Sequence, residues 1–232
     1  MIHVAMRPFM IRAVVITSIC MLAACAGLGI RTDSRAAFET GLTLFNQGKY
    51  NDAIPHFVKA TELDAEFGQA YLYLGRSYLN VQRWFDALSP LRTAWRLSPG
   101  ETQKEMVSIL LDALIGAAGA RLSQGQLQES VSLFKEALTL APESDQVKRP
   151  MLGALLAYGG QLLSQGNASE AVSAYTEATQ LAPQGVEGYI GLARSFFQSG
   201  DFLGALTAAG NAMRLAPTNL DARSLFQQLQ RR

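Results

Sequence analysis

Side chains that could carry out catalysis are scarce in this sequence. It holds two histidines and two cysteines among 232 residues, and only His56 and Cys25 fall outside the first 24 residues. A histidine and cysteine metal site, or a nucleophile activated by histidine, needs more such groups. Glu101, Glu105 and Asp112 share one face of a predicted helix, but carboxylates at this spacing usually form a solvated face. We therefore expect a protein that is not an enzyme, with no catalytic residue, no metal and no cofactor.

The elements that would position any site are helices that recur along the chain. Residues 123–142, SQGQLQESVSLFKEALTLAP, place a turn-forming glycine before apolar residues at a period near 3.6 and end on a proline. Related segments begin at Gly48, Gln82, Gly166 and Gly200. Such a repeat predicts stacked helical units without a single central core.

The spacing of these segments resembles that of a known repeat family. Their closing residues, Ala65, Pro99, Pro142, Pro183 and Pro217, are 34, 43, 41 and 34 residues apart. A 34-residue helix-turn-helix period with small, aromatic and proline residues in fixed places resembles the tetratricopeptide repeat. The last repeat matches the pattern at Tyr189, Leu192, Ala193, Phe196, Gly200, Phe202, Ala205, Ala212, Leu215 and Pro217. The resemblance covers residues 34–217. It implies an all-α fold, a right-handed α-α superhelix of about five repeats with a C-terminal capping helix.

The predicted organisation follows from this register. A signal peptide is expected at 1–24, a lipid-anchored linker at 25–33, repeats at 34–67, 68–101, 102–144, 145–185 and 186–218, and the capping helix at 219–232. The third and fourth repeats carry extra residues, which we expect to lengthen their first helices. Thr102 would cap one of these helices, and Pro150 would lie near the start of the other. The extra residues are either a tolerated insertion or a docking edge.

The N-terminal segment has the features of an export signal. Arg7 and Arg12 precede an uncharged stretch over residues 13–30, and the sequence LAAC ending at Cys25 resembles the lipobox of bacterial lipoproteins. The resemblance implies acylation of Cys25, including palmitate, and anchoring in a membrane. Ala26, in place of Asp, implies the outer membrane, with the protein facing the periplasm. The periplasmic side of the inner membrane is the alternative location, and an uncleaved membrane helix is the alternative structure.

Composition narrows the class of partner. Hydrophobic residues make up 49% and charged residues 17%, with a formal net charge of +1. Because no basic stripe with interleaved aromatics is present, we expect no nucleic acid partner.

The family resemblance also implies a binding surface on the first helix of each repeat. The positions that would line this groove are Phe38, Leu42, Phe45, Leu72, Arg76, Leu79, Ile115, Gly119, Leu122, Leu156, Gly160, Leu163, Ile190, Arg194 and Phe197. An apolar groove of this kind suits an amphipathic helix or an extended apolar segment of a protein or peptide partner. Arg76 and Arg194 would orient that partner, and Gly119 and Gly160 would let its backbone approach. Alternatively, these side chains are buried between repeats.

The residues of this groove do not match the carboxylate clamp of the relatives that bind chaperone tails. Phe38 and Leu42 stand where the first lysine and asparagine of that clamp would be, and Ile115 and Gly119 replace its later basic pair. The predicted function is therefore that of a scaffold or adaptor in assembly of the cell envelope, in pilus, secretion or cell-wall machinery. The alternative is a self-associating subunit of a secretion or polysaccharide-export complex, and the oligomeric state is left open.

Overall fold

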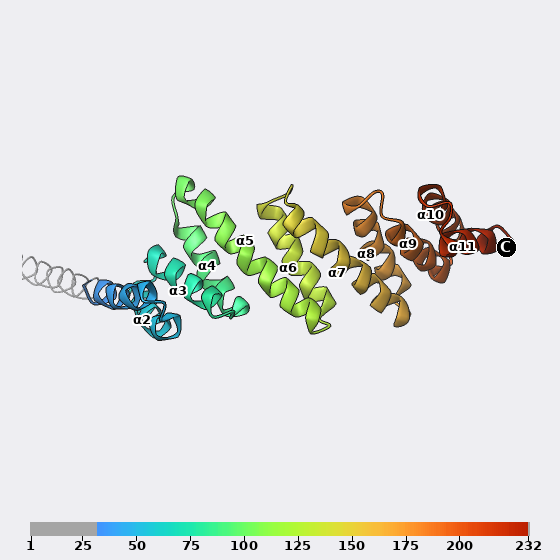
Figure 1. The fold of residues 1–232 in the computed structure, drawn as a ribbon. Coiled ribbons are helices and arrows are strands. Elements are labelled where there is room, and N and C mark those ends of the chain that lie inside the picture. The colour runs from blue at the N-terminus through green and yellow to red at the C-terminus, as the bar shows by residue number, and fades with distance from the viewer. Residues whose placement is uncertain (1–31, 232) are drawn as a thin grey trace, which may run out of the picture. The chain divides into compact units, whose positions relative to one another are not determined.

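The computed structural model describes residues 32–231 (Figure 1). Over this range the chain consists of helices joined by short turns, with no strand. The all-α prediction is therefore confirmed. Residue contacts divide the chain into two units, Met1–Leu110 and Leu111–Arg232, whose boundary falls inside one long helix.

The first unit contains alternating first and second helices of successive repeats. It begins in a helix over residues 32–46, and continues through α2 (Tyr50–Leu63), α3 (Gly68–Asn80), α4 (Trp84–Leu97) and the start of α5 (Gly100–Ser123). Helix α3 packs against both α2 and α4.

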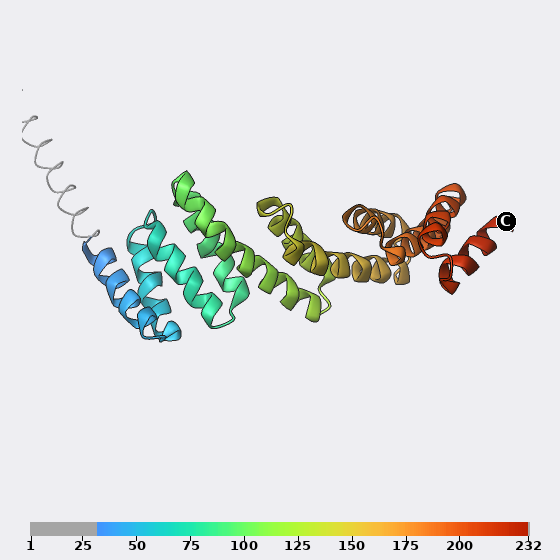
Figure 2. The same cartoon turned by 45° about the horizontal axis from the view of Figure 1, so that its top comes forward.

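The second unit continues the same alternation. After the remainder of α5 it contains α6 (Leu127–Leu140), α7 (Asp145–Ser164), α8 (Ala168–Leu181), α9 (Val186–Ser199), α10 (Phe202–Leu215) and α11 (Leu220–Gln230). From α6 to α11 each helix packs against the next, and α9 also contacts α7 and α11 (Figure 2). The first helices therefore form a layer of direct neighbours within this unit.

Each pair of helices is joined by the same turn. The residue in the left-handed region is Gly48, Gln82, Gly125, Gly166 or Gly200, with φ between 58° and 88°. In every case the next amide donates to a carbonyl five residues earlier, as in Gln126 N to Arg121 O at 2.9 Å. This bond closes a Schellman motif and satisfies a carbonyl at the end of the first helix. Gln82 is the one non-glycine residue of the described chain with a positive φ.

Small residues allow the two helices of a repeat to approach closely, as the sequence predicts. Ala53, Ala87, Ala171 and Ala205 are fully buried. A Cβ added at Gly75 would lie 2.4 Å from Leu91, and one added at Gly41 would lie 2.9 Å from Phe57. Since real Cβ atoms do not tolerate such distances, the large side chain of the second helix occupies the space that glycine leaves.

The long helices α5 and α7 correct two local predictions. Helix α5 already begins at Gly100, with Gln103 N bonded to Pro99 O at 3.1 Å, so Thr102 lies inside the helix and does not cap it. Pro150 is the sixth residue of α7, inside the helix and past its first turn. The added turn of α5 is held to α4 by side-chain bonds: Gln103 Nε2 donates to Trp95 O at 3.1 Å.

Helix α5 is also apolar enough to resemble a membrane span. Thr102–Ser123 has a mean hydropathy of 1.5 over its most apolar window. Its small and apolar residues nevertheless pack inside the repeats, since Ala113, Leu114, Ala117 and Ala118 are fully buried. Length and composition alone therefore do not make this segment a membrane helix.

Candidate functional site

In the first unit, the predicted groove positions cover a cluster of aromatic rings. Phe38 is only 5% exposed, and its ring centroid lies 4.9 Å from that of Phe67 and 5.7 Å from that of Phe57. Phe38 therefore belongs to the core and presents no surface to a partner. The other predicted positions here, Leu42, Phe45, Leu72, Arg76 and Leu79, are all partly exposed.

Arg76 is held over this cluster. Its guanidinium carbon lies 5.4 Å from the ring centroid of Phe45 and 5.3 Å from that of Tyr73. Both distances are within the range of a cation–π interaction. The Phe45 and Tyr73 rings are themselves edge to face at 5.1 Å. Arg76 is thus fixed in place while remaining partly exposed.

In the second unit, the predicted positions combine half-buried apolar side chains with exposed backbone. Ile115, Leu122, Leu156, Leu163 and Phe197 are partly exposed, whereas Gly119 and Gly160 are exposed. A Cβ added at Gly119 would meet nothing within 4 Å.

Ile190 differs from these residues, because it is 8% exposed and packs with Ala212 and Ala222. The capping helix α11 therefore covers it, and Ile190 belongs to the core.

Arg194 extends from α9 toward the capping helix. Its guanidinium lies 3.8 Å from Asp221 Oδ2, and both side chains are more than half exposed. An ion pair with such exposed side chains and such a long separation contributes little to stability. Arg194 is therefore available to a competing acidic group.

Tyr175 is a residue near the groove that the sequence analysis missed. It comes from the second-helix layer, on α8, and is 7% exposed. Its hydroxyl oxygen would lie 3.6 Å from a Cβ added at the exposed Gly160. Burial raises the pKa of Tyr175, while the charge of Arg194 acts in the opposite direction. A comparison of the repeats would have found it, because the corresponding positions hold Phe57 and Phe134.

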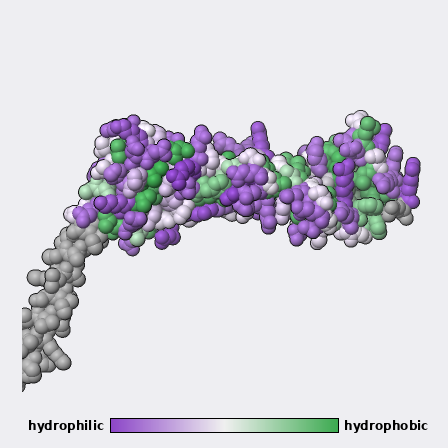
Figure 3. Space-filling model, turned by 90° about the horizontal axis from the view of Figure 1, so that it is seen from below, coloured by the Kyte–Doolittle hydropathy of each residue, from purple (hydrophilic) through white to green (hydrophobic). Residues whose placement is uncertain are grey.

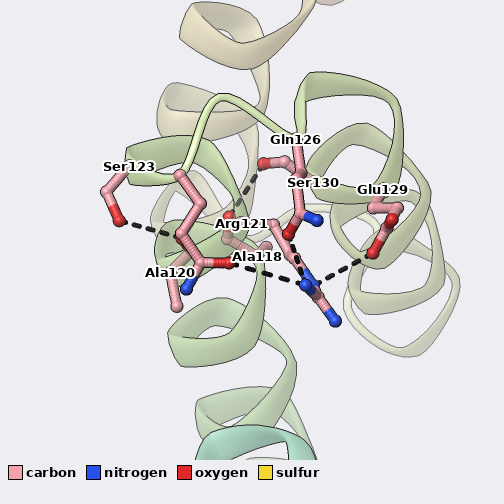
Figure 4. Close-up of polar contacts among 8 residues, drawn as sticks. Ala118, Ala120, Arg121, Ser123, Gln126, Glu129 and Ser130 are labelled. Atoms are coloured by element: carbon pink, nitrogen blue, oxygen red, sulfur yellow. Dashed lines mark hydrogen bonds and ion pairs between the residues drawn. The ribbon is translucent and has the colours of Figure 1, made fainter.

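A polar cluster joins α5 to α6 near the end of the predicted groove (Figure 4). Arg121 Nε lies 3.0 Å from Glu129 Oε2, and the Arg121 guanidinium also donates to Gln126. Ser130 Oγ donates to Ala118 O at 2.8 Å in the buried contact between the two helices. The cluster lies at the turn of this repeat, where the other repeats carry Leu44, Tyr78, Leu162 and Phe196 in place of Arg121.

Titratable groups do not gather into a catalytic or metal-binding cluster in the described part of the chain. Within residues 32–231 no three of His, Cys, Asp and Glu lie close enough to hold a metal ion. Lys148 Nζ donates to Glu143 Oε2 at 2.7 Å, and this bond and the lysine charge hold the pKa of Glu143 below its ordinary value. His56 is a partly buried residue of α2. Cys25 lies outside the described residues.

The surface carries apolar patches separated by hydrophilic side chains in both units (Figure 3). The large apolar side chains that are most exposed lie in the second unit: Phe202 at 53%, Leu203 at 77% and Leu220 at 76%.

Comparison with known proteins agrees with the fold. The family model described as tetratricopeptide repeat matches residues 38–102 and 161–219, together more than half of the chain. A TPR repeats protein from Bacteroides fragilis superposes with a TM-score of 0.57 at 15% identity, over 86% of this chain and 99% of its own.

Two further structures are less similar. YrrB, described as a TPR protein with an unusual peptide-binding site, gives a TM-score of 0.35 at 17% identity, over 82% of this chain and 90% of its own. The TPR2AB domain of yeast Sti1, in its pHSP90 complex, gives a TM-score of 0.33 at 18% identity, over 85% of this chain and 83% of its own. Among curated proteins none matches the sequence. The chain therefore belongs to the tetratricopeptide repeat family.

Proposed function

We propose that this protein is a non-catalytic scaffold whose first helices bind segments of partner proteins. The supporting observation is that apolar groove positions stay partly exposed in both units, as with Leu72 and Leu79 on α3 and Leu156 and Leu163 on α7. Apolar surface left exposed in the folded state gains free energy when a partner covers it. Tetratricopeptide repeat proteins are generally scaffolds for protein–protein interaction, which agrees with this proposal.

Site-specific photocrosslinking in cells tests the groove directly. A photoreactive residue at Leu72 or Leu163 should capture a partner, whereas one at the exposed Ser89 or Ser132 on a second helix should not. Glu substitutions at the two leucine positions should abolish capture while leaving the helical signal in circular dichroism unchanged. Equal capture from both layers, or capture from the second helices alone, would refute the groove.

We further propose that the scaffold acts at the cell envelope, anchored through an acylated Cys25. The proposal is supported by the LAAC sequence behind a positively charged, then uncharged, N-terminal segment. Mass spectrometry of the protein from membranes should find an acylated cysteine as the first residue, and Cys25→Ser should remain unprocessed. An intact N-terminus beginning at Met1 in the wild-type protein would contradict the anchor.

Self-association is a second candidate function, favoured by the exposed apolar side chains of the last repeat. Phe202 and Leu203 begin α10 with 53% and 77% of their area exposed, and side chains of this type are depleted from most monomer surfaces. Light scattering over a range of concentrations separates the two functions. A mass that rises with concentration, and is restored to the monomer by Leu203→Ser, supports a self-associating subunit, whereas a constant monomer mass supports the adaptor.

A further inference from the structure

An open cavity of about 350 Å³ lies between the start of α6, the second half of α7 and the start of α8. It belongs wholly to the second unit. Side-chain amides dominate its lining, which includes Gln126, Gln128, Gln161, Gln165 and Asn167. The carboxylates of Glu129 and Glu170 and the partly exposed Tyr158 also line it. A cavity of this volume is within the range of sites for small ligands.

Most of these amides have no task within the fold. Asparagine is a preferred residue for capping a helix, yet the side chain of Asn167 accepts no cap bond from α8. In the next repeat Asp201, at the corresponding position, does accept one from Gly204 N at 2.8 Å. The amide of Asn167 is therefore exposed to solvent and can exchange its water for the polar groups of a ligand.

The repeat does not need long amide side chains on its first helix. Gln161 and Gln165 of α7 correspond to Ser195 and Ser199 of α9. Ser195 is fully buried and donates to Gly191 O at 2.8 Å, and Ser199 also donates to a carbonyl of its own helix. Both serines are thus satisfied within α9. Gln161 and Gln165 instead stay exposed and reach into the cavity, which is a property specific to the fourth repeat.

The charges around the cavity exclude an anionic ligand. Neither Lys nor Arg is among the described residues that line it. Arg121 lies 3.0 Å from Glu129 and so neutralises that carboxylate (Figure 4), which leaves Glu170 as an acceptor. An amide side chain both donates and accepts hydrogen bonds, and a carboxylate accepts them. Hydroxyl groups complement this lining best, because each of them also donates and accepts.

A second cavity extends the first one between α6 and α8. Its volume is about 180 Å³, and Tyr158 and Glu170 line both cavities. Lys135 and Glu177 also line the second cavity, and their ion pair joins α6 to α8 at 2.7 Å. We call the two cavities together the furrow. Because Tyr158 lies where they meet, its ring can pack against the C–H groups of a ligand that occupies both.

We infer that the furrow binds a neutral oligosaccharide. The amides and Glu170 exchange hydrogen bonds with the sugar hydroxyls, Tyr158 packs against the C–H face of a sugar ring, and the two cavities together hold more than one ring. A peptide would also offer donors and acceptors, but it is selected mainly through pockets for its side chains, and the larger cavity is mostly polar. The furrow lies between second helices, so this inference does not depend on the groove of the first helices.

An array of neutral, uronic-acid and free-amino oligosaccharides, probed with the full-length protein, tests the inference. We expect binding to neutral saccharides, and calorimetric titration with the strongest of them then measures the variants. Gln161→Ala and Asn167→Ala should each weaken binding about fivefold, the loss of one hydrogen bond. Glu170→Gln should change it by less than about twofold, because an acceptor remains and the saccharide is uncharged. Gln180→Ala, an exposed position of α8 outside both cavities, is the matched control and should bind as wild type does.

Both alanine variants change exposed side chains, so their circular dichroism should match that of the wild type. Equal binding by wild type and both variants would overturn the inference, as would an array on which no saccharide or only charged ones bind. A loss of about tenfold or more in Glu170→Gln would assign a cationic ligand instead. Displayed peptides that displace the saccharide and lose binding in Gln161→Ala would make the furrow a peptide site. Leu72→Glu, which tests the groove, should leave saccharide binding unchanged, so the two proposals fail independently.

Discussion

Two neighbouring glycines of α7 should respond in opposite ways to the same substitution. Gly159 lies against the Tyr175 ring, whereas Gly160 is exposed, with only the Tyr175 hydroxyl near its added Cβ at 3.6 Å. In a helix interior, alanine is more favourable than glycine by about 1 kcal/mol. Gly160→Ala should therefore raise the free energy of unfolding by about that amount.

At Gly159 the same gain is outweighed by overpacking. The added methyl group would stand within 2.9 Å of three ring atoms, and the ring cannot retreat because it already lies against Gly191. Overpacking of this kind costs about 1 to 3 kcal/mol. After the helix gain of about 1 kcal/mol, we expect Gly159→Ala to lower stability by up to about 2 kcal/mol.

Urea unfolding followed by circular dichroism measures both changes on the same scale. The two alanine variants should differ by about 1 to 3 kcal/mol, which is the overpacking cost itself. In the background of Tyr175→Ala, the penalty at Gly159 should disappear, because the ring that causes it is absent. If both alanines shift the midpoint in the same direction by similar amounts, or if the penalty survives removal of the ring, the account of this contact is wrong.

Three other predictions follow from local features. Gln82→Gly should raise the free energy of unfolding in urea by about 1 kcal/mol, because Gln82 has a φ of 58° that glycine adopts without strain. Gly125→Ala should lower the free energy of unfolding, because the φ of Gly125 is also positive. Tyr175 has a raised pKa, so its contribution to stability is complete below the ordinary value of 10.0 and falls as the pH rises above it. Tyr175→Phe should therefore flatten the alkaline fall of the unfolding midpoint. Arg121→Leu should change stability by less than about 1 kcal/mol, because Glu129 is 58% exposed and tolerates the loss of its partner; a larger loss would give the cluster a structural role.

Much of the fold can be predicted from the sequence because the residues that determine it lie close together along the chain. The turn glycines, the 3.6-residue period and the small residues such as Gly75 each reflect contacts within one repeat, and the structure places them accordingly. The helix starts were less predictable: α5 begins at Gly100, before Thr102, and its first intrahelical bond runs from Gln103 N to Pro99 O.

The burial of the groove positions could not be predicted in the same way. The helical register places Phe38 and Ile190 on the first helices, but burial depends on what covers them. Phe38 is covered by the rings of Phe57, Phe67 and Tyr73. Ile190 packs with Ala222 of the capping helix. Tyr175 was not predicted as a groove residue, since its place beside the groove depends on glycines in two other helices.

The passage of Tyr175 between α7 and α9 ties the fourth repeat to the fifth through one side chain. A linear array unfolds from its ends, because a terminal repeat has only one neighbour to stabilise it. The ring lies against the backbones of Gly159 and Gly191, so this contact is lost when the fifth repeat separates from the fourth. Amide hydrogen exchange in α10 and α11 should accordingly quicken in Tyr175→Ala, because the last repeat then opens more easily.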